Sequence, residues 1–370
     1  MAFGLTTLNL ILPVLPLTVA RATGNAGVAG FVTVSIALMT VVSELQAARL
    51  LSRFRPLSLL LAGLLLEMVA MAGFAEIRAL PAMLVLGGLV GAGFGTVATV
   101  STVMMGSLAP PERRGEVIGY YGLAASLPSV IAPTTGLLLL NGVGLSAVFW
   151  TGAATSLVAA LLATRLRLQR PAGTAQPTGG LFATLTTRRV LLIWAAFVCV
   201  TFTFGAVVSF TPLLLPGGGL GSAPMFLLLA GIARTATRTL SGRVIDRLGD
   251  WRPVWPALVI GGLALAMLPL RQPVLTVVAA VLFGAALGVV QTGTFIGMLR
   301  STHPSRAGLV GGLWNVAVDV GFGTSALILA PVAALVGYQA MFWILPALFA
   351  AALGARTAEW RSRTARPPGR

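Results

Sequence analysis

The chain contains no lysine, one cysteine, one histidine and only nine acidic side chains among its 370 residues. Cys199 alone can form neither an intramolecular disulfide nor a thiolate metal cluster. His303 alone makes no metal site and supplies little of the acid, base and nucleophile cluster that a membrane enzyme needs. Without lysine there is no G-x-x-x-x-G-K-[ST] loop for binding ATP. We therefore expect no metal, no cofactor and no enzymatic activity.

Apolar residues dominate the sequence. It is 57% hydrophobic and 9% charged, with a mean hydropathy of +0.94, which is typical of a chain that lies in a lipid bilayer. A hydrocarbon core of about 30 Å requires about 20 helical residues, and charge-poor runs of that length recur along the chain. They predict an all-α membrane protein with twelve transmembrane helices, at residues 1–20, 27–48, 57–75, 80–108, 117–140, 146–164, 190–215, 225–242, 254–270, 273–299, 307–334 and 338–355.

The basic residues fit a membrane topology. All 25 are arginines, and most lie between the apolar runs. With both termini in the cytoplasm, the inner loops and the C-terminal tail hold 20 of them, and the outer loops hold only Arg21, Arg78 and Arg271, as the positive-inside rule requires. We predict a multi-pass protein of a bacterial-type inner (plasma) membrane. We predict no nucleic-acid partner, because the arginines do not lie together on one soluble surface with the aromatic or polar residues that contact bases.

A long polar segment and an internal repeat divide the chain into two halves. Residues 1–164 are predicted to form one six-helix bundle and 190–355 another, joined by a cytoplasmic linker, 165–189, and followed by a basic tail, 356–370. At an offset of 193, Gly91 matches Gly284 and Gly95 matches Gly288, and further matches continue to the Phe-Trp pair at 149–150 and 342–343. Parallel repeats of this kind place a solute site near the bilayer midplane.

The loop after the predicted helix 225–242 carries a family signature. Residues 242–252, GRVIDRLGDWR, resemble the G-x-x-x-D-R-x-G-x-R/K-x-R motif of the major facilitator superfamily. The counterpart after helix 27–48 keeps Arg49 and Arg53, but Ser52 replaces the acidic residue. The resemblance implies a cytoplasmic gate, in which Asp246 accepts hydrogen bonds from an arginine or a helix N-terminus; the alternative is a solvated turn. The predicted gate residues are Gly242, Arg243, Asp246, Arg247, Arg49, Arg53, Glu44 and Arg238.

The predicted helix 117–140 is similar to the family's antiporter motif, G-x8-G-x3-G-P-x2-G-G. Gly119, Pro133 and Gly136 stand at the expected places, whereas three other positions lack the family's glycine. The resemblance implies a monomeric carrier of the drug/proton-antiporter type, whose partners are a small solute, protons and the lipid bilayer. Helix 80–108 departs from it, since it lacks the arginine that many proton-coupled exporters carry there.

Ionisable residues inside predicted spans are the candidates for proton coupling. Each costs about 2.5–3.5 kcal/mol to insert, so these side chains are expected to face the bundle interior. The depths of Asp319 and Arg234 agree, which predicts an ion pair that protons or solute break; a static clamp is the alternative. Glu67 is either a coupling carboxylate or a hydrogen-bonded structural one.

Four polar residues interrupt apolar spans where a solute would bind. Asn9, Thr99, Thr203 and Gln291 could contact it, or could satisfy only a neighbouring helix. A mostly apolar cavity with few polar groups suits an amphipathic or hydrophobic solute. Proton-coupled efflux by alternating access is the predicted function. The alternatives are uptake or facilitated transport of a sugar or other metabolite, a membrane enzyme and a receptor that does not transport.

Overall fold

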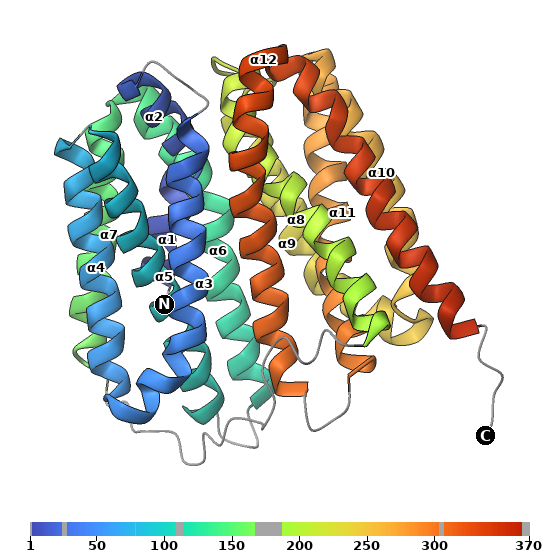
Figure 1. Ribbon diagram of the computed structural model, residues 1–370, viewed down its shortest axis with the longest axis horizontal. Helices are drawn as coiled ribbons and strands as arrows, with labels where there is room; N and C mark the ends of the chain where they lie inside the picture. The colour runs from blue at the N-terminus through green and yellow to red at the C-terminus, as the bar shows by residue number, and fades with distance from the viewer. Residues whose placement is uncertain are drawn as a thin grey trace. The chain divides into compact units, whose positions relative to one another are not determined.

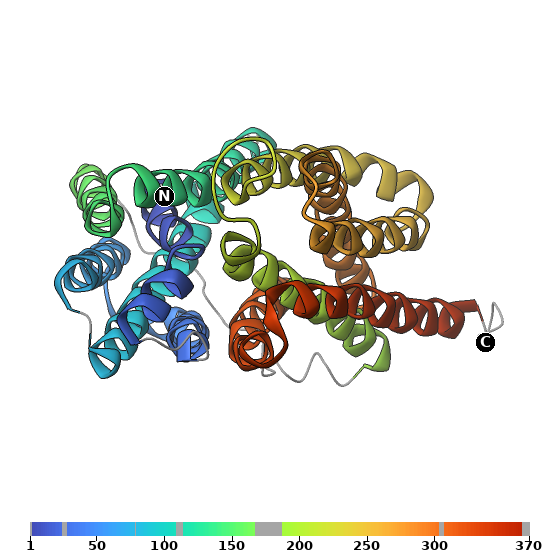
Figure 2. The same ribbon diagram turned by 90° about the horizontal axis from the view of Figure 1, so that it is seen from above.

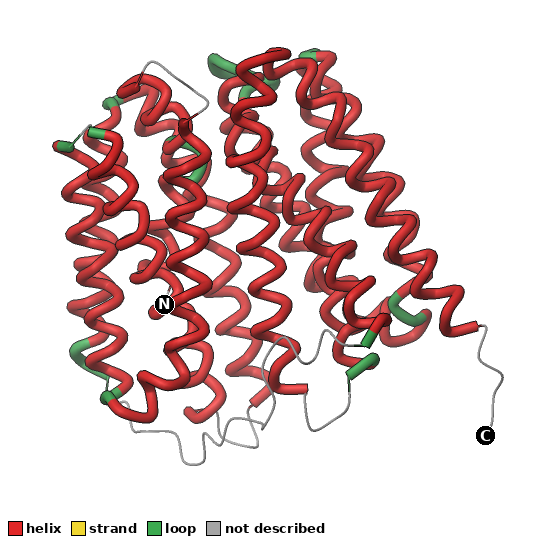
Figure 3. Tube along the Cα trace, viewed as in Figure 1, coloured by secondary structure: helices red, strands yellow, loops and turns green. Residues whose placement is uncertain are grey.

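The computed structural model describes residues 2–23, 28–77, 79–108, 114–166, 187–302 and 307–364, and every regular element among them is a helix (Figures 1 and 3). If α1 with α2 counts as one span and α12 as two, this part of the chain forms the twelve predicted helices, so the predicted fold class is confirmed. The elements are α1 (Ala2–Ile11), α2 (Leu15–Thr23), α3 (Ala29–Arg53), α4 (Pro56–Glu76), α5 (Leu80–Leu108), α6 (Arg114–Gly142), α7 (Leu145–Ala163), α8 (Arg188–Leu214), α9 (Ala223–Leu248), α10 (Trp251–Met267), η4 (Leu268–Leu270), α11 (Pro273–Arg300) and α12 (Ala307–Thr364).

Two local sequence features set the helix breaks. Pro13 lies in the turn between α1 and α2, where a ring without an N–H cannot continue the helical hydrogen bonds. Gly337 interrupts α12 with a φ of 82°, a left-handed conformation that glycine adopts without steric cost. The chain therefore reverses at Gly337, and Figure 1 shows the two runs of α12, 307–336 and 338–364, diverging from this bend.

By length and apolar composition, seven of the described helices qualify as membrane spans. The helix α9 is not among them, because Arg234 and Arg238 interrupt its centre. Because α9 lies among helices that do qualify, its arginines need an environment other than lipid.

Two compact units divide the chain, one formed mainly by α1–α7 and the other mainly by α8–α12. In the first unit, buried leucines of α3 and α4 pack with valines of α5 and alanines of α7. In the second, Val190 and Ile193 of α8 pack with Met298 of α11 and with Val310 and Leu313 of α12. Figure 2 shows the second run of α12 alongside α8, and side-chain contacts join these two helices.

The internal repeat is visible in how the helices pack within each unit. A Cβ on Gly91 of α5 would collide with the Ile36 carbonyl of α3, and one on Gly284 of α11 would collide with the Ala230 carbonyl of α9. One turn further along, Gly95 and Gly288 approach the other helix in the same way. Ile36 and Ala230 are themselves separated by 194 residues, so each unit contains the same close helix crossing.

Candidate functional site

Two arginines on one face of α9 lie over aromatic rings of neighbouring helices. The Arg234 guanidinium is 5.0 Å from the centre of the Phe204 ring of α8. Arg238 follows one turn later, and its guanidinium is 5.8 Å from the centre of the Trp314 ring of α12. Because residues four apart share a helix face, α9 presents both cations to the same side. Each cation–π contact contributes about 0.5–2 kcal/mol, depending on how dry it is.

Further aromatic residues surround these two contacts. Trp314 stacks on Phe197 of α8 at 4.8 Å between ring centres, and Phe295 of α11 meets it edge-on at 6.0 Å. Phe204 meets Phe322 of α12 edge-on, also at 6.0 Å. We call the resulting group, drawn from four helices of the second unit, the cation–aromatic cluster: Arg234, Arg238, Phe197, Phe204, Phe295, Trp314 and Phe322.

The arginines of this cluster are accessible although they lie near the middle of a helix between membrane spans. Arg234 is half-buried and Arg238 is exposed. An arginine at that depth is costly in hydrocarbon, so it faces protein or a water-filled cavity. Asp319 is half-buried in α12, and its ion pair with Arg234 stays a prediction.

Two buried polar atoms lie in or next to the cluster without a hydrogen-bond partner in the described part of the chain. They are Oε1 of Gln291, one turn before Phe295 in α11, and the indole nitrogen, Nε1, of Trp314. A buried polar atom without a partner costs about 1–3 kcal/mol, so such atoms call for an explanation. One of these atoms accepts a hydrogen bond and the other donates one.

The other three predicted solute contacts differ from Gln291. Asn9 donates its side-chain amide to the Leu5 carbonyl of its own helix at 2.7 Å. Thr203 is buried and donates to the Cys199 carbonyl at 2.9 Å. Thr99 is half-buried in α5. Gln291 is therefore the one of the four for which the structure records an unsatisfied polar atom.

Glu67 lies fully buried in the first unit, within a chain of hydroxyl groups. Ser156 of α7 donates to Glu67 Oε2 at 3.1 Å, and the Thr7 hydroxyl of α1 lies 2.7 Å from that of Ser156. Glu67 Oε1 has no partner among the described residues. These contacts join α1, α4 and α7, which agrees with the interpretation of Glu67 as a hydrogen-bonded structural carboxyl group. A role of Glu67 in proton coupling stays a prediction.

The predicted gate residues of the second unit lie at the end of α9. Asp246 forms an ion pair with Arg300 of α11 at 3.3 Å, and both side chains are well exposed. Arg243 and Arg247 are exposed as well, and nothing lies within 4 Å of a Cβ built on Gly242. An exposed pair of this kind contributes at most about 1 kcal/mol to stability.

The gate residues of the first unit are partly described. Arg53 is exposed and Glu44 is half-buried, both in α3. The side chain of Arg49, also in α3, lies outside the described residues.

The antiporter-like motif lies in α6. Pro133 is buried, and a Cβ on Gly136 would collide with the Leu10 carbonyl, so this glycine allows α6 to approach α1 closely. The burial of Gly119, also in α6, lies outside the described part of the structure.

A buried ion cluster in the second unit is absent from the candidate residues predicted above. Arg356 of α12 donates to Asp250 Oδ2 at 2.6 Å and to Glu359 Oε2 at 2.9 Å, and these three side chains are at most 2% exposed. Arg189 of α8 donates to the other oxygen of Glu359 at 3.1 Å. In the sequence, Arg356 is the first residue of the predicted basic tail, 356–370, whereas in the structure α12 continues to Thr364. Two arginines and two carboxylates thus join α8, the start of α10 and the end of α12.

Comparison with known proteins supports this architecture. The family model of the Major Facilitator Superfamily matches residues 1–326. A staphylopine export protein of Staphylococcus aureus (strain Mu50 / ATCC 700699) is 24% identical over 250 residues, which cover 64% of this chain and 63% of that protein. The uncharacterized MFS-type transporter Rv1250 of Mycobacterium tuberculosis (strain ATCC 25618 / H37Rv) is 32% identical over 139 residues, 37% of this chain and 24% of that one. The matched segments thus span less than two thirds of either relative.

Solved structures show the same fold. A mutant of the nucleoside transporter NupG aligns with 97% of this chain and 98% of its own, with a TM-score of 0.74 at 13% identity. Another structure of NupG aligns with 98% of this chain and all of its own, with a TM-score of 0.69, also at 13% identity. The chain therefore belongs to the major facilitator superfamily, a family of membrane transporters rather than enzymes.

Proposed function

We propose that the protein is a secondary active transporter that exports a small, amphipathic and negatively charged solute in exchange for protons. The observation that carries this proposal is the cation–aromatic cluster, where Arg234 and Arg238 lie 5.0 Å and 5.8 Å from the centres of aromatic rings. Guanidinium groups bind carboxylates and phosphates through paired hydrogen bonds, and the rings offer apolar surface to the rest of the solute.

The charge balance of the helices that carry the cluster favours an anion. Asp319 is the one carboxylate in the middle of these helices, since α8 and α11 have no acidic residue and Asp246 lies at the far end of α9. One carboxylate against two arginines leaves a net positive charge where the solute would bind. The partner-free atoms of Gln291 and Trp314 add an acceptor and a donor for its neutral polar groups.

Two observations support export. The chain is similar to a protein described as an exporter of staphylopine, and α6 keeps Pro133 and Gly136 of the antiporter-like motif. Proton coupling would act through Asp319, whose carboxyl group can either pair with Arg234 or take up a proton and release it. Uptake or facilitated transport of a metabolite by the same fold is the second candidate. NupG, whose structure is similar, is described as a nucleoside transporter.

Transport by purified protein in liposomes tests the proposal. Indole-3-acetate and its neutral amide, indole-3-acetamide, form a matched pair of probes that differ in one charge. With a pH gradient, we expect the protein to move the carboxylate at least about tenfold faster than the amide, because a charge-assisted hydrogen bond is about twice as strong as a neutral one. The Arg238→Gln substitution should remove that preference. The control is Arg165→Gln, an exposed arginine of the first unit.

The outcomes are separable. Equal transport of both probes, or an unchanged preference in Arg238→Gln, contradicts an anionic solute. Reversal of the direction of net flux for the same pH gradient favours uptake over export. A transport rate that does not depend on the pH gradient contradicts proton coupling.

A further inference from the structure

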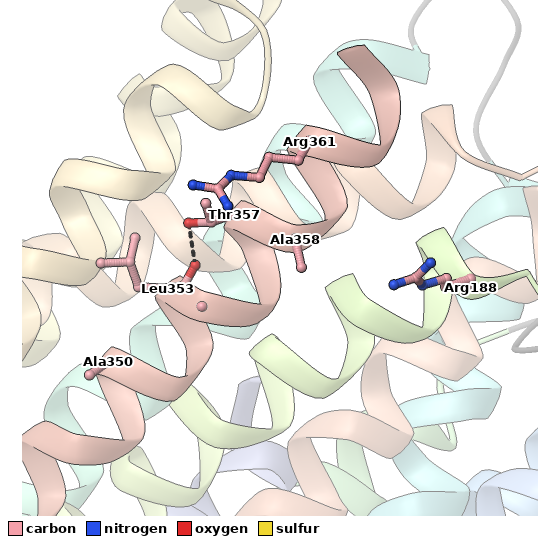
Figure 4. A pocket seen from close by; sticks show the side chains of 7 residues that line it. Arg188, Ala350, Leu353, Thr357, Ala358 and Arg361 are labelled. Carbon is pink, nitrogen blue, oxygen red and sulfur yellow. Dashed lines mark hydrogen bonds between the residues drawn. The ribbon is translucent and has the colours of Figure 1, made fainter. Parts of the chain in front are cut away.

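Two further groups of polar side chains lie outside the cation–aromatic cluster. One lines an open groove between α8 and α12, where the Thr357 hydroxyl is already satisfied, since it donates to the Leu353 carbonyl at 2.7 Å (Figure 4). The other is the chain of hydroxyl groups around Glu67 in the first unit. Glu67 is fully buried, and its Oε1 oxygen has no partner among the described residues. A buried carboxyl oxygen of this kind calls for an explanation.

The contacts around Glu67 involve oxygen atoms only. Ser156 donates to Glu67 Oε2 at 3.1 Å, and the Thr7 hydroxyl lies 2.7 Å from that of Ser156. The Thr7 hydroxyl is also 3.2 Å from the Thr155 hydroxyl and 3.4 Å from the Gly152 carbonyl oxygen. Each hydroxyl group has a single proton to donate but two lone pairs. The group therefore has more lone pairs than protons, and within the described chain no arginine forms an ion pair with Glu67.

This excess of lone pairs and the carboxylate charge select a small cation as the occupant. A buried carboxylate is costly unless a positive charge is paired with it. Carboxylate, hydroxyl and carbonyl oxygens suit hard cations rather than the transition metals that thiolates and imidazoles bind. A monovalent ion balances the one carboxylate, whereas Ca²⁺ takes about 6–8 oxygen ligands and would leave a buried charge uncompensated. Neighbouring oxygens only 2.7–3.4 Å apart favour Na⁺ over the larger K⁺.

The second unit shows that packing does not require these polar groups. At an offset of 194, Gly261 of α10 corresponds to Glu67 of α4, and the buried positions of the two helices correspond as well. At an offset of 193, Phe349 of α12 corresponds to Ser156 of α7. A Cβ on Gly261 would collide with the Phe349 ring, so in the second unit an aromatic ring fills this helix crossing. The first unit has a carboxyl group where an apolar arrangement is possible, which favours a role in binding.

We propose that the first unit binds Na⁺ through the Glu67 carboxylate and the hydroxyl groups of Ser156 and Thr7. The Thr155 hydroxyl and the Gly152 carbonyl, both next to Thr7, are available to complete the coordination. Glu67 and Ser156 lie near the middle of α4 and α7, so the ion joins α1, α4 and α7 inside the span. The proposal depends neither on the solute proposed for the cation–aromatic cluster nor on Asp319, which belongs to the second unit.

Binding of radiolabelled Na⁺ to the purified full chain in detergent tests the proposal. We expect saturable binding that unlabelled Na⁺ displaces and that K⁺ at the same concentration does not. Glu67→Gln keeps the size of the side chain and should lower the Na⁺ affinity at least about tenfold, because even the loss of an outer partner of a metal ligand costs about 10–100-fold. The matched control is Glu76→Gln, an exposed carboxylate at the end of the same helix, which should leave Na⁺ binding unchanged.

Melting temperatures provide a second measurement. NaCl should raise the melting temperature and KCl at equal ionic strength should not, because an ion that binds only the folded state stabilises it. Ser156→Ala and Thr7→Val keep the carboxylate and should each weaken Na⁺ binding about fivefold, so they decide the matter if Glu67→Gln does not fold.

The outcomes that overturn the proposal are distinct. Absence of Na⁺ binding, or equal effects of the two salts, overturns it and indicates that a proton or a water molecule satisfies Glu67. Na⁺ binding that is unchanged in Glu67→Gln, or in both hydroxyl variants, places the ion elsewhere and overturns it as well.

Discussion

Replacing Arg356 with methionine is expected to destabilise the protein strongly. Arg356 is fully buried and donates to two carboxylates, at 2.6 Å to Asp250 and at 2.9 Å to Glu359. Methionine fills much of the same volume, so the substitution removes the charge and leaves little cavity. Glu359 keeps Arg189, but Asp250 loses its arginine in a site where it is 2% exposed. Removing one partner of a buried ion pair costs about 3–5 kcal/mol, because the remaining charge stays in a poorly solvated site.

An exposed ion pair provides the reference for this loss of unfolding free energy. Asp246 and Arg300 are 3.3 Å apart, with side chains 72% and 43% exposed. Water screens this pair, so Arg300→Gln should cost no more than about 1 kcal/mol. Unfolding by sodium dodecyl sulfate in mixed micelles measures both variants on one scale. Trp251 reports the buried site, since the Arg356 guanidinium lies 5.9 Å from its ring centre.

Restoring the charge balance should recover stability. In the double variant Arg356→Met with Asp250→Asn, one cation and one carboxylate leave together, and Arg189 and Glu359 remain paired at 3.1 Å. We expect the double variant to be more stable than Arg356→Met alone, because buried ion groups can be replaced together at little cost. If Arg356→Met loses no more free energy than Arg300→Gln, or if Asp250→Asn adds a further loss, then the buried cluster does not stabilise the unit as argued.

Three further changes separate packing, coupling and binding. Gly91→Ala should lower the free energy of unfolding by about 1–3 kcal/mol in the same titration, because its Cβ would collide with a carbonyl of α3. Gly354→Ala is the control and should leave the free energy of unfolding unchanged, because the space around Gly354 is open. Equal losses in the two variants would contradict the close helix crossing. Asp319→Asn should abolish the pH dependence of liposome transport, and retained pH-driven flux would remove Asp319 from coupling. Gln291→Leu should raise the solute's KM about tenfold without lowering stability, because it removes a buried oxygen that has no partner among the described residues; an unchanged KM would exclude contact with the solute.

The helices were predictable from the sequence because the bilayer imposes one length and one composition on each span. The breaks at Pro13 and Gly337 follow from residue chemistry as well, since proline removes a donor and glycine tolerates a positive φ, here 82°. The end of α12 was less predictable. A chain that leaves the membrane can remain helical, and charge alone does not mark where the helix stops.

The buried ion cluster was missed for a related reason. Arg356 and Glu359 lie among the charged residues that follow the last apolar run, and such residues are usually solvated. Their spacing carries the missing signal, because Leu345, Phe349 and Ala352 are buried at helical intervals that continue directly to Arg356 and Glu359. When the buried face of a helix ends in an arginine and a glutamate, these two side chains are expected to have charged partners on the helices that this face contacts. The partners themselves, Arg189 and Asp250, come from distant parts of the chain and need the fold.

The two units share a helix crossing but differ in the side chains that it positions. At an offset of 194, Arg234 and Arg238 of α9 correspond to Thr40 and Glu44 of α3. The Thr40 hydroxyl donates to the Gly91 carbonyl at 3.2 Å, so in the first unit this position contributes to helix packing. In the second unit the arginine at the same position lies over a phenylalanine ring. Because the backbone crossing is the same, the difference in charge is not required by packing, which favours a role for the two arginines in binding an anion.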